Sequence, residues 1–304
     1  MASFIGRRLI TIVIFIVHGH LLNAQFKQIF IKDKQTKEPL AYATVLLIKE
    51  SKVCYSDSIG TLFLEEKLIQ QNDSLEISFI NYKKLLVTGS MLAASNQILL
   101  ERSFFQLREV IVSDCKEEEI IRITDKYGTI QSSNGAGFDI PIKLLGFYPN
   151  ETGKEGWLSS IEFYASSVKQ PDAKLRIHWY EWDELKKEPG KDITDTNIIV
   201  AVHKNGWNKI DIPEKRIFVG SKGIVLGFDM IYPSTIFKAY KEIKDDIEAR
   251  QFRFKYNWFL GSSVTDEKEG FDLFKDIQIL PSRYLKEKRY HKPAIHLYIK
   301  TCSN

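Results

Sequence analysis

Four polar and aromatic residues in one short run are the best candidates for chemistry: Arg176, His178, Tyr180 and Trp182. They alternate with Leu175, Ile177 and Trp179, and alternate side chains of a strand point to the same face. If the apolar residues face a core, the four candidates share the other face. Aromatic rings stack on the C–H faces of a sugar, and charged neighbours bond its hydroxyls. The run therefore predicts a glycan-binding platform, with a packing face or an interface with another domain as the alternative.

Acidic and imidazole side chains elsewhere could bind a metal. Four aspartates offer the oxygen ligands that calcium prefers: Asp192, Asp195, Asp211 and Asp272. Their spacing does not match the twelve-residue calcium loop, and solvated turn carboxylates are the alternative. His291 and His296 are separated by Pro293, which breaks a helix, so they are not a helical metal pair. We predict no metal site and no cofactor.

Signatures of catalysis are missing from the sequence. It has no Gly-x-Ser-x-Gly turn, no glycine-rich phosphate loop and no His-Glu-x-x-His pair. Glu162 and Glu181 lie on predicted strands, but their separation along the chain does not determine the distance between them in space. We therefore predict a protein that is not an enzyme and retain a glycoside hydrolase as an alternative.

The elements that must position the four candidates lie in a predicted domain over residues 127–304. Period-two runs rich in apolar and aromatic residues predict strands at 157–166, 174–182, 196–203, 207–212, 223–232, 250–260 and 294–300. Between two of them, residues 234–250 place apolar side chains at helical spacing, with Ser234 as a predicted N-cap. This order predicts a jelly-roll-like β-sandwich with one inserted helix. The pattern faintly resembles galactose-binding-like jelly rolls.

A smaller all-β domain is predicted upstream, over residues 25–112. Predicted strands lie at 26–32, 43–48, 53–56, 62–64, 75–79, 85–88, 97–100 and 109–112. Spaced features recur through it: Asp33, Thr36, Pro39, Leu40, Ala43, Val45, Asp57, Gly60, Leu62, Leu64, Leu75, Ile77, Tyr82, Leu107, Glu109, Val110 and Val112. Over residues 26–112 this pattern resembles the carboxypeptidase-regulatory-like domain.

That resemblance implies a seven-stranded transthyretin-like sandwich of the kind common in exported and outer-membrane proteins of Gram-negative bacteria. It implies an accessory module rather than a peptidase, and residues 25–112 contain no histidine for a zinc site. Asn81 departs from the pattern, because the family usually has glycine there. Asparagine also tolerates a left-handed backbone, so the same turn is expected.

The segment between the two domains, residues 113–126, is rich in charge and is interpreted as a linker. Its run from Glu117 to Ile123 predicts a short helix. The domain boundary is placed near Asp125.

The N-terminus predicts export. Arg7 and Arg8 precede an apolar run at residues 9–17, and Ala24 offers a small residue at the exit, which together are typical of a cleavable signal peptide over residues 1–24. Nine apolar residues fall short of the roughly 20 that span a bilayer, so the alternative of a membrane anchor is less favoured.

Composition excludes several classes of protein. The chain has 304 residues, 44% hydrophobic and 27% charged, which is ordinary for globular domains. Its net charge is +4, and two of the positive charges belong to the signal peptide. Nucleic-acid binding would need a clustered basic face, so no nucleic-acid partner is predicted.

The mature chain has an odd number of cysteines, Cys54, Cys115 and Cys302, so at most one internal bridge can form. Cys115 and Cys302 flank the second domain and are the candidate pair. Three unpaired thiols are the alternative.

These observations predict a non-catalytic exported cell-envelope protein, periplasmic or associated with the outer membrane or cell surface. An accessory β-sandwich precedes a second sandwich that is expected to bind a ligand, either a glycan or another envelope component. A structural or assembly factor that holds a protein partner at the outer membrane is the main alternative, and a hydrolase with an unrecognised site is the other.

Overall fold

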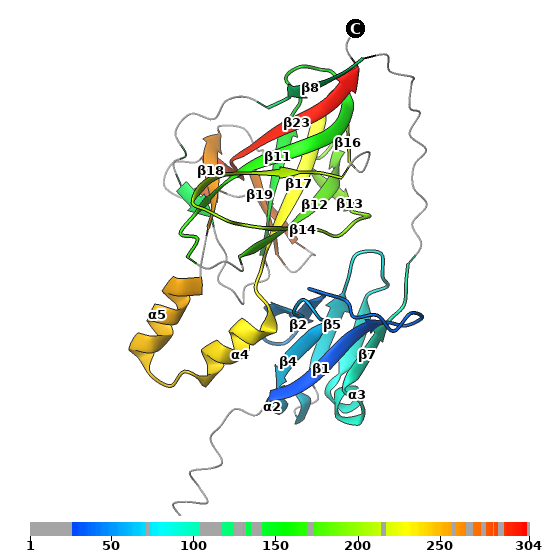
Figure 1. The fold of residues 1–304 in the computed structure, drawn as a ribbon, viewed down its shortest axis with the longest axis vertical. Helices are drawn as coiled ribbons and strands as arrows, with labels where there is room; N and C mark the ends of the chain where they lie inside the picture. Colours follow the sequence, from blue (N-terminus) through cyan, green and yellow to red (C-terminus); the bar gives the residue numbers. More distant parts are fainter. Residues whose placement is uncertain are drawn as a thin grey trace, which may run out of the picture.

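The structure is a computed structural model. It describes residues 26–302 with these gaps: 71–72, 104–116, 125–129, 131, 135–141, 170–172, 214–216, 257–258, 266–269, 275–277, 282 and 285–288. The predicted signal peptide lies outside the described residues. The described chain is mostly β and forms two bodies, one below the other in Figure 1.

The first body packs two sheets around one core. The three-stranded sheet has the order β4-β1-β7: β4 (Thr61–Glu65), β1 (Phe26–Asp33) and β7 (Gln97–Leu100). The four-stranded sheet has the order β3-β2-β5-β6: β3 (Lys52–Tyr55), β2 (Thr44–Leu47), β5 (Ser74–Ser78) and β6 (Leu85–Thr88). Two short helices, α2 (Glu66–Gln70) and α3 (Gly89–Ala94), close one end of the body. The predicted strand at 109–112 lies outside the described residues.

Alternation explains this core. Ile29 and Ile31 of β1 face Val45 of β2 and Ile77 of β5, and all four are almost fully buried. Because strand side chains alternate, their neighbours Phe30 and Lys32 point outward and stay partly exposed.

The second body packs a seven-stranded sheet against a nine-stranded one. The first follows the order β13-β12-β17-β10-β19-β20, with β14 also on β12: β13 (Glu188–Asp192), β12 (Lys174–Asp183), β17 (Gly223–Ile231), β10 (Ile142–Pro149), β19 (Gly270–Phe274), β20 (Gln278–Pro281) and β14 (Ile198–Ala201). The second is built around β11 (Gly156–Ser166) and β23 (Ile295–Cys302), with β8 (Glu118–Arg122), β9 (Ser132–Asn134), β15 (Gly206–Asp211), β16 (Phe218–Val219), β18 (Phe259–Thr265), β21 (Arg283–Tyr284) and β22 (Arg289–Pro293).

The predicted single helix is instead two helices, α4 (Ser234–Glu242) and α5 (Asp246–Tyr256). The predicted strand is therefore wrong over residues 250–256. The aromatic residues that suggested it also fit helical spacing, and the ring centroids of Phe252 and Tyr256 stack 4.3 Å apart, one helical turn apart in sequence. Asp245 was the overlooked signal, since its Oδ1 accepts the N–H of Glu248 at 2.8 Å, as an N-cap does.

The predicted linker helix is also wrong. Residues 118–122 form β8, which pairs antiparallel with β23 at the edge of the nine-stranded sheet. Ile120 is 62% exposed, whereas its neighbour Ile121 packs against the core of the second body. That alternation is the signature of a strand, and pairing with β23 outweighs the helical propensity of the glutamates.

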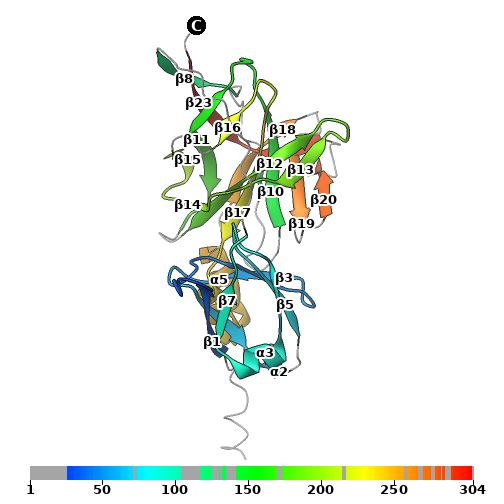
Figure 2. The same cartoon turned by 90° about the vertical axis from the view of Figure 1, so that its right-hand side faces the viewer.

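The two bodies dock through β3, β4 and α4. Val53 and Tyr55 of the first body pack on Ile231 at the end of β17. Lys241 of α4 lies 3.3 Å from Glu65 at the end of β4. Figures 1 and 2 show α4 and α5 beside the first body, reached by the chain that leaves β17.

Candidate functional site

The four predicted residues lie on β12, in the seven-stranded sheet. Their apolar neighbours Leu175, Ile177 and Trp179 point into the core between the two sheets. Arg176, His178 and Tyr180 therefore lie on the opposite face, although each is 5% exposed or less. This face is covered over most of its length, so what covers each residue decides what it can do.

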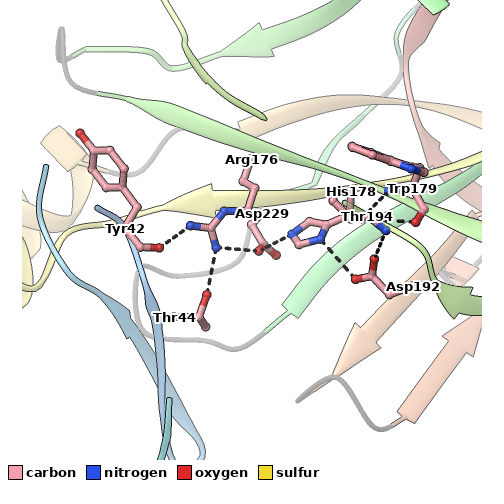
Figure 3. A network of polar contacts seen from close by, with 8 residues as sticks. All are labelled: Tyr42, Thr44, Arg176, His178, Trp179, Asp192, Thr194 and Asp229. Carbon is pink, nitrogen blue, oxygen red and sulfur yellow. Dashed lines mark hydrogen bonds and ion pairs between the residues drawn. The ribbon is translucent and has the colours of Figure 1, made fainter. Parts of the chain in front are cut away.

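Arg176 lies under the first body and is 2% exposed. Its Nη1 donates to Thr44 Oγ1 at 3.0 Å, and its Nη2 donates to the carbonyl of Tyr42 (Figure 3). The guanidinium also lies 5.7 Å from the centre of the Tyr55 ring, in cation–π geometry. Arg176 therefore lies at an interface with the other domain, which the sequence analysis gave as the alternative to a glycan-binding platform.

His178 lies between two carboxylates. Its Nε2 is 3.0 Å from Asp229 Oδ2 and its Nδ1 is 3.3 Å from Asp192 Oδ2. Asp229 belongs to β17, directly opposite Arg176, and lies 4.0 Å from the guanidinium. Figure 3 shows these side chains as one continuous row from the first body to Asp192.

The charge balance of the row keeps both carboxylates ionised. Burial works to raise the pKa of Asp229, but the charges of Lys143, His178 and Arg176 and the bond to His178 outweigh it, so the pKa is lowered. The pKa of Asp192 is lowered too. Desolvation works to raise it, but the hydrogen bond and charge of His178, the charge of Lys143 and the hydrogen bond from Thr194 outweigh that effect. Arg176, Asp229 and His178 therefore form a buried ionic row, whose contacts a low dielectric strengthens. Asp192, at the end of this row, has a side chain that is 41% exposed.

Tyr180 and Trp182 belong to a different environment, further along β12. Tyr180 packs with Leu145 and Val225, and Trp182 packs at the edge of this cluster. The rings of Trp182 and Phe147 stack with centroids 4.3 Å apart and planes 13° apart. The second half of the predicted row is thus aromatic and apolar rather than ionic.

A pocket of about 380 Å³ opens beside these aromatic residues. Its lining combines four aromatic residues, one glutamate, an exposed isoleucine and the first three residues of β17: Trp179, Tyr180, Glu181, Trp182, Ile193, Phe218, Gly223, Ile224 and Val225. Phe218 is 42% exposed and Ile193 is 43% exposed. We call this cavity the aromatic pocket.

Of the four predicted residues, Tyr180 and Trp182 line the aromatic pocket, whereas Arg176 and His178 do not. Sequence reasoning missed Phe218, because β16 has only two residues and shows no period. It also missed Ile193, which lies beyond the end of a strand. Phe218 is held by the pairing of β16 with β11, and Ile193 is held by its hydrogen bond to Trp179 of β12.

The other candidates are scattered. Asp192 contacts His178, while Asp211 is exposed on β15 of the other sheet. Glu162 accepts a hydrogen bond from Tyr298 at 2.7 Å on the nine-stranded sheet, so it does not pair with Glu181. The described residues contain no cluster of three metal-ligating side chains. The side chains of Asp272 and His291 lie outside the described part, and His296 stacks on Trp207.

A second cavity, of about 400 Å³, lies at the junction of the two bodies, between Tyr42, Lys174 and the start of α4. It contains none of the four predicted residues.

Among the cysteines, Cys54 is free and buried, and its pKa is raised to about 12 by burial. Cys302 is disulfide-bonded, so the alternative of three unpaired thiols is wrong. Cys115 lies outside the described residues.

Within the part of the chain that the structure describes, none of the helices is long and apolar enough to cross a membrane.

Comparisons with known proteins assign no family to the chain. No family model matches the chain, and no curated protein matches it. One similar solved structure is a crystal structure from Bacteroides uniformis, provisionally assigned as a carbohydrate binding protein. It shares 11% identity over 90% of this chain and 98% of that chain, with a TM-score of 0.18. So low a score establishes neither a common fold nor a common ligand, and the resemblance of residues 26–112 to the carboxypeptidase-regulatory-like domain stays a prediction.

Proposed function

We propose that this chain is an exported, non-catalytic cell-envelope protein whose second body binds a glycan in the aromatic pocket. The observation that carries the proposal is the lining of that pocket, to which Trp182, Tyr180 and Phe218 belong together with the acidic residue Glu181. The proposal includes a transthyretin-like first body and a jelly-roll-like second body. Export rests on the predicted signal peptide.

The chemistry of the lining suits a sugar. A pyranose offers apolar C–H faces to aromatic rings and hydroxyls to a carboxylate acceptor. The volume of about 380 Å³ lies within the range of small-ligand sites, roughly 300–1,000 Å³. Strands of a packed sheet hold most of the lining, so little ordering has to accompany binding.

Binding without turnover fits the acids that are present. Glycoside hydrolysis commonly needs a pair of carboxylates across the scissile bond. Among the described residues that line the pocket, Glu181 supplies one carboxylate. We therefore propose a role for Glu181 in hydrogen bonding to the ligand rather than in proton transfer.

A glycan array followed by calorimetry on the mature chain tests the proposal. We expect saturable binding to at least one polysaccharide and a loss of about tenfold or more in Trp182→Ala, because a stacking surface is removed. Trp207→Ala is the matched control, since Trp207 is also half-buried but lies on the other sheet. Thermal melts of both variants show that each is folded.

Two results would overturn the proposal. The first is the absence of sugar affinity in the wild type, above all if a defined envelope protein co-purifies with it. The second is release of reducing ends from the bound polysaccharide that Glu181→Gln abolishes, which would make the pocket a hydrolase site.

A further inference from the structure

We infer that the first body positions one wall of the aromatic pocket, with Asn81 and Arg176 as the positioning residues. The wall is Ile193, carried by residues 192–195, which begin at the last residue of β13 and which we call the 192–195 segment. The inference rests on the proposed function, since it explains how that pocket keeps its shape.

The 192–195 segment is bonded to β12 at two consecutive residues and is braced by one bond of its own. The N–H of Ile193 donates to the carbonyl of Trp179 at 3.0 Å. Thr194 Oγ1 accepts the N–H of Trp179 at 2.9 Å, and the N–H of Thr194 donates to Asp192 Oδ1 at 2.9 Å. Ile193 and Trp179, which face each other across these bonds, both line the pocket.

One connection from the first body reaches the segment through the buried ionic row. Thr44 and Tyr42 hold Arg176, which lies 4.0 Å from Asp229. Asp229 contacts His178, and His178 contacts Asp192 at the start of the segment. Arg176, His178 and Asp229 are each 4% exposed or less, so water screens the contacts among these three little. The last contact, from His178 to Asp192, lies closer to solvent, because the Asp192 side chain is 41% exposed.

A second connection reaches the other end of the segment directly. Asn81 Nδ2 donates to the carbonyl of Asp195. Asn81 has a φ of 67°, a left-handed conformation that is uncommon for residues other than glycine. Glycine would satisfy that backbone but has no amide, so the bond to Asp195 gives a physical reason for asparagine at this turn.

Both ends of the 192–195 segment are therefore attached to the first body, while its middle forms the pocket wall. The first body then helps to fix the shape of the binding site and is not only a spacer. Removing either attachment should loosen Ile193 without touching any group that lines the pocket.

Hydrogen exchange on the ligand-free mature chain tests this directly. In Asn81→Gly we expect the amides of Ile193 and Thr194 to exchange about fivefold faster, the factor that corresponds to loss of one hydrogen bond. Thr44→Val removes an acceptor of Arg176 and should act in the same direction. Lys37→Gly is the matched control, because Lys37 has a φ of 62° in an exposed turn of the first body.

Exchange in β1 and β5 shows whether the first body remains folded in each variant. Unchanged protection of Ile193 and Thr194 in both Asn81→Gly and Thr44→Val would overturn the inference. If the wild type binds no glycan, the proposed function is wrong. The hydrogen-exchange test of the inference still applies, because it uses the ligand-free chain. If a glycan does bind, Asn81→Gly should weaken it by a similar factor and Lys37→Gly should not.

Discussion

Asp33 is a buried carboxylate at the end of β1 that accepts four hydrogen bonds. Tyr82 Oη and Arg102 Nε donate to its Oδ2 at 2.6 and 2.7 Å, and the N–H groups of Gln35 and Thr36 donate to its Oδ1. Asp33, Thr36 and Tyr82 all belong to the spaced pattern seen in the sequence. Part of that pattern is therefore the signature of one bonded carboxylate.

These bonds make the stability of the first body depend on pH. These hydrogen bonds lower the pKa of Asp33. The bond from Tyr82 has the largest effect, followed by those from Thr36 and Arg102. A lowered pKa stabilises the fold fully above the value of the unfolded chain, about 3.9. The stabilisation is lost as the pH falls below that value.

We expect the free energy of unfolding of the wild type, from urea titrations, to fall between about pH 5 and about pH 2.5. Asp33→Asn should be less stable at the upper pH and should show a smaller decrease. Glu38→Gln, in the exposed part of the same loop, should behave as the wild type does. Parallel curves for Asp33→Asn and the wild type would contradict the assignment.

At the scale of elements, α4 is defined by what it touches as much as by its own sequence. Ser234 was predicted as its N-cap, but Pro233 occupies that position and the structure shows no side-chain cap bond there. The hydroxyl of Ser234 is fully buried and instead accepts the N–H of Phe63 in β4 at 3.0 Å. The residue that starts the helix thus also joins it to the first body.

Ser234→Ala should therefore destabilise the chain by about 1 kcal/mol, because it removes the acceptor of the partly buried N–H of Phe63. Urea denaturation followed by circular dichroism measures the change. Thr235→Ala removes an exposed hydroxyl from the same turn and should have little effect. Equal losses in the two variants would show that the contribution is helical propensity rather than the bond between the bodies.

At the scale of the whole molecule, the buried ionic row couples two bodies that each have their own core. Arg176 is the link, since it contacts Thr44 and Tyr42 on one side and Asp229 on the other. We therefore expect the described bodies to unfold in one calorimetric transition.

Arg176→Met should lower the free energy of unfolding by about 3 kcal/mol, since removing one partner leaves the others buried with less compensation. It should also broaden the transition or divide it in two. Arg250→Met, on the exposed side of α5, is the control. A single sharp transition in Arg176→Met, with no loss of stability, would show that the bodies are not coupled through this residue.

The sequence by itself determined which residues share a face. Strand period is a local property of the backbone, so the alternation of Leu175, Ile177 and Trp179 with Arg176 and His178 could be predicted correctly from a few residues. The same reasoning failed at α5, where aromatic residues four apart suit both a strand and a helix. It also failed at β8, where pairing with β23 prevailed over helical propensity.

Only the tertiary structure decided what each face meets. Arg176 and Thr44 are 132 positions apart in the sequence, and Asn81 and Asp195 are 114 apart. No local sequence pattern can therefore predict either contact. Phe218 likewise lies on β16, which pairs with the distant strand β11 and not with its neighbours in sequence, yet it lines the aromatic pocket with Trp182. Burial and charge compensation depend on which surfaces are brought together, and that choice is made by the packing of the whole chain.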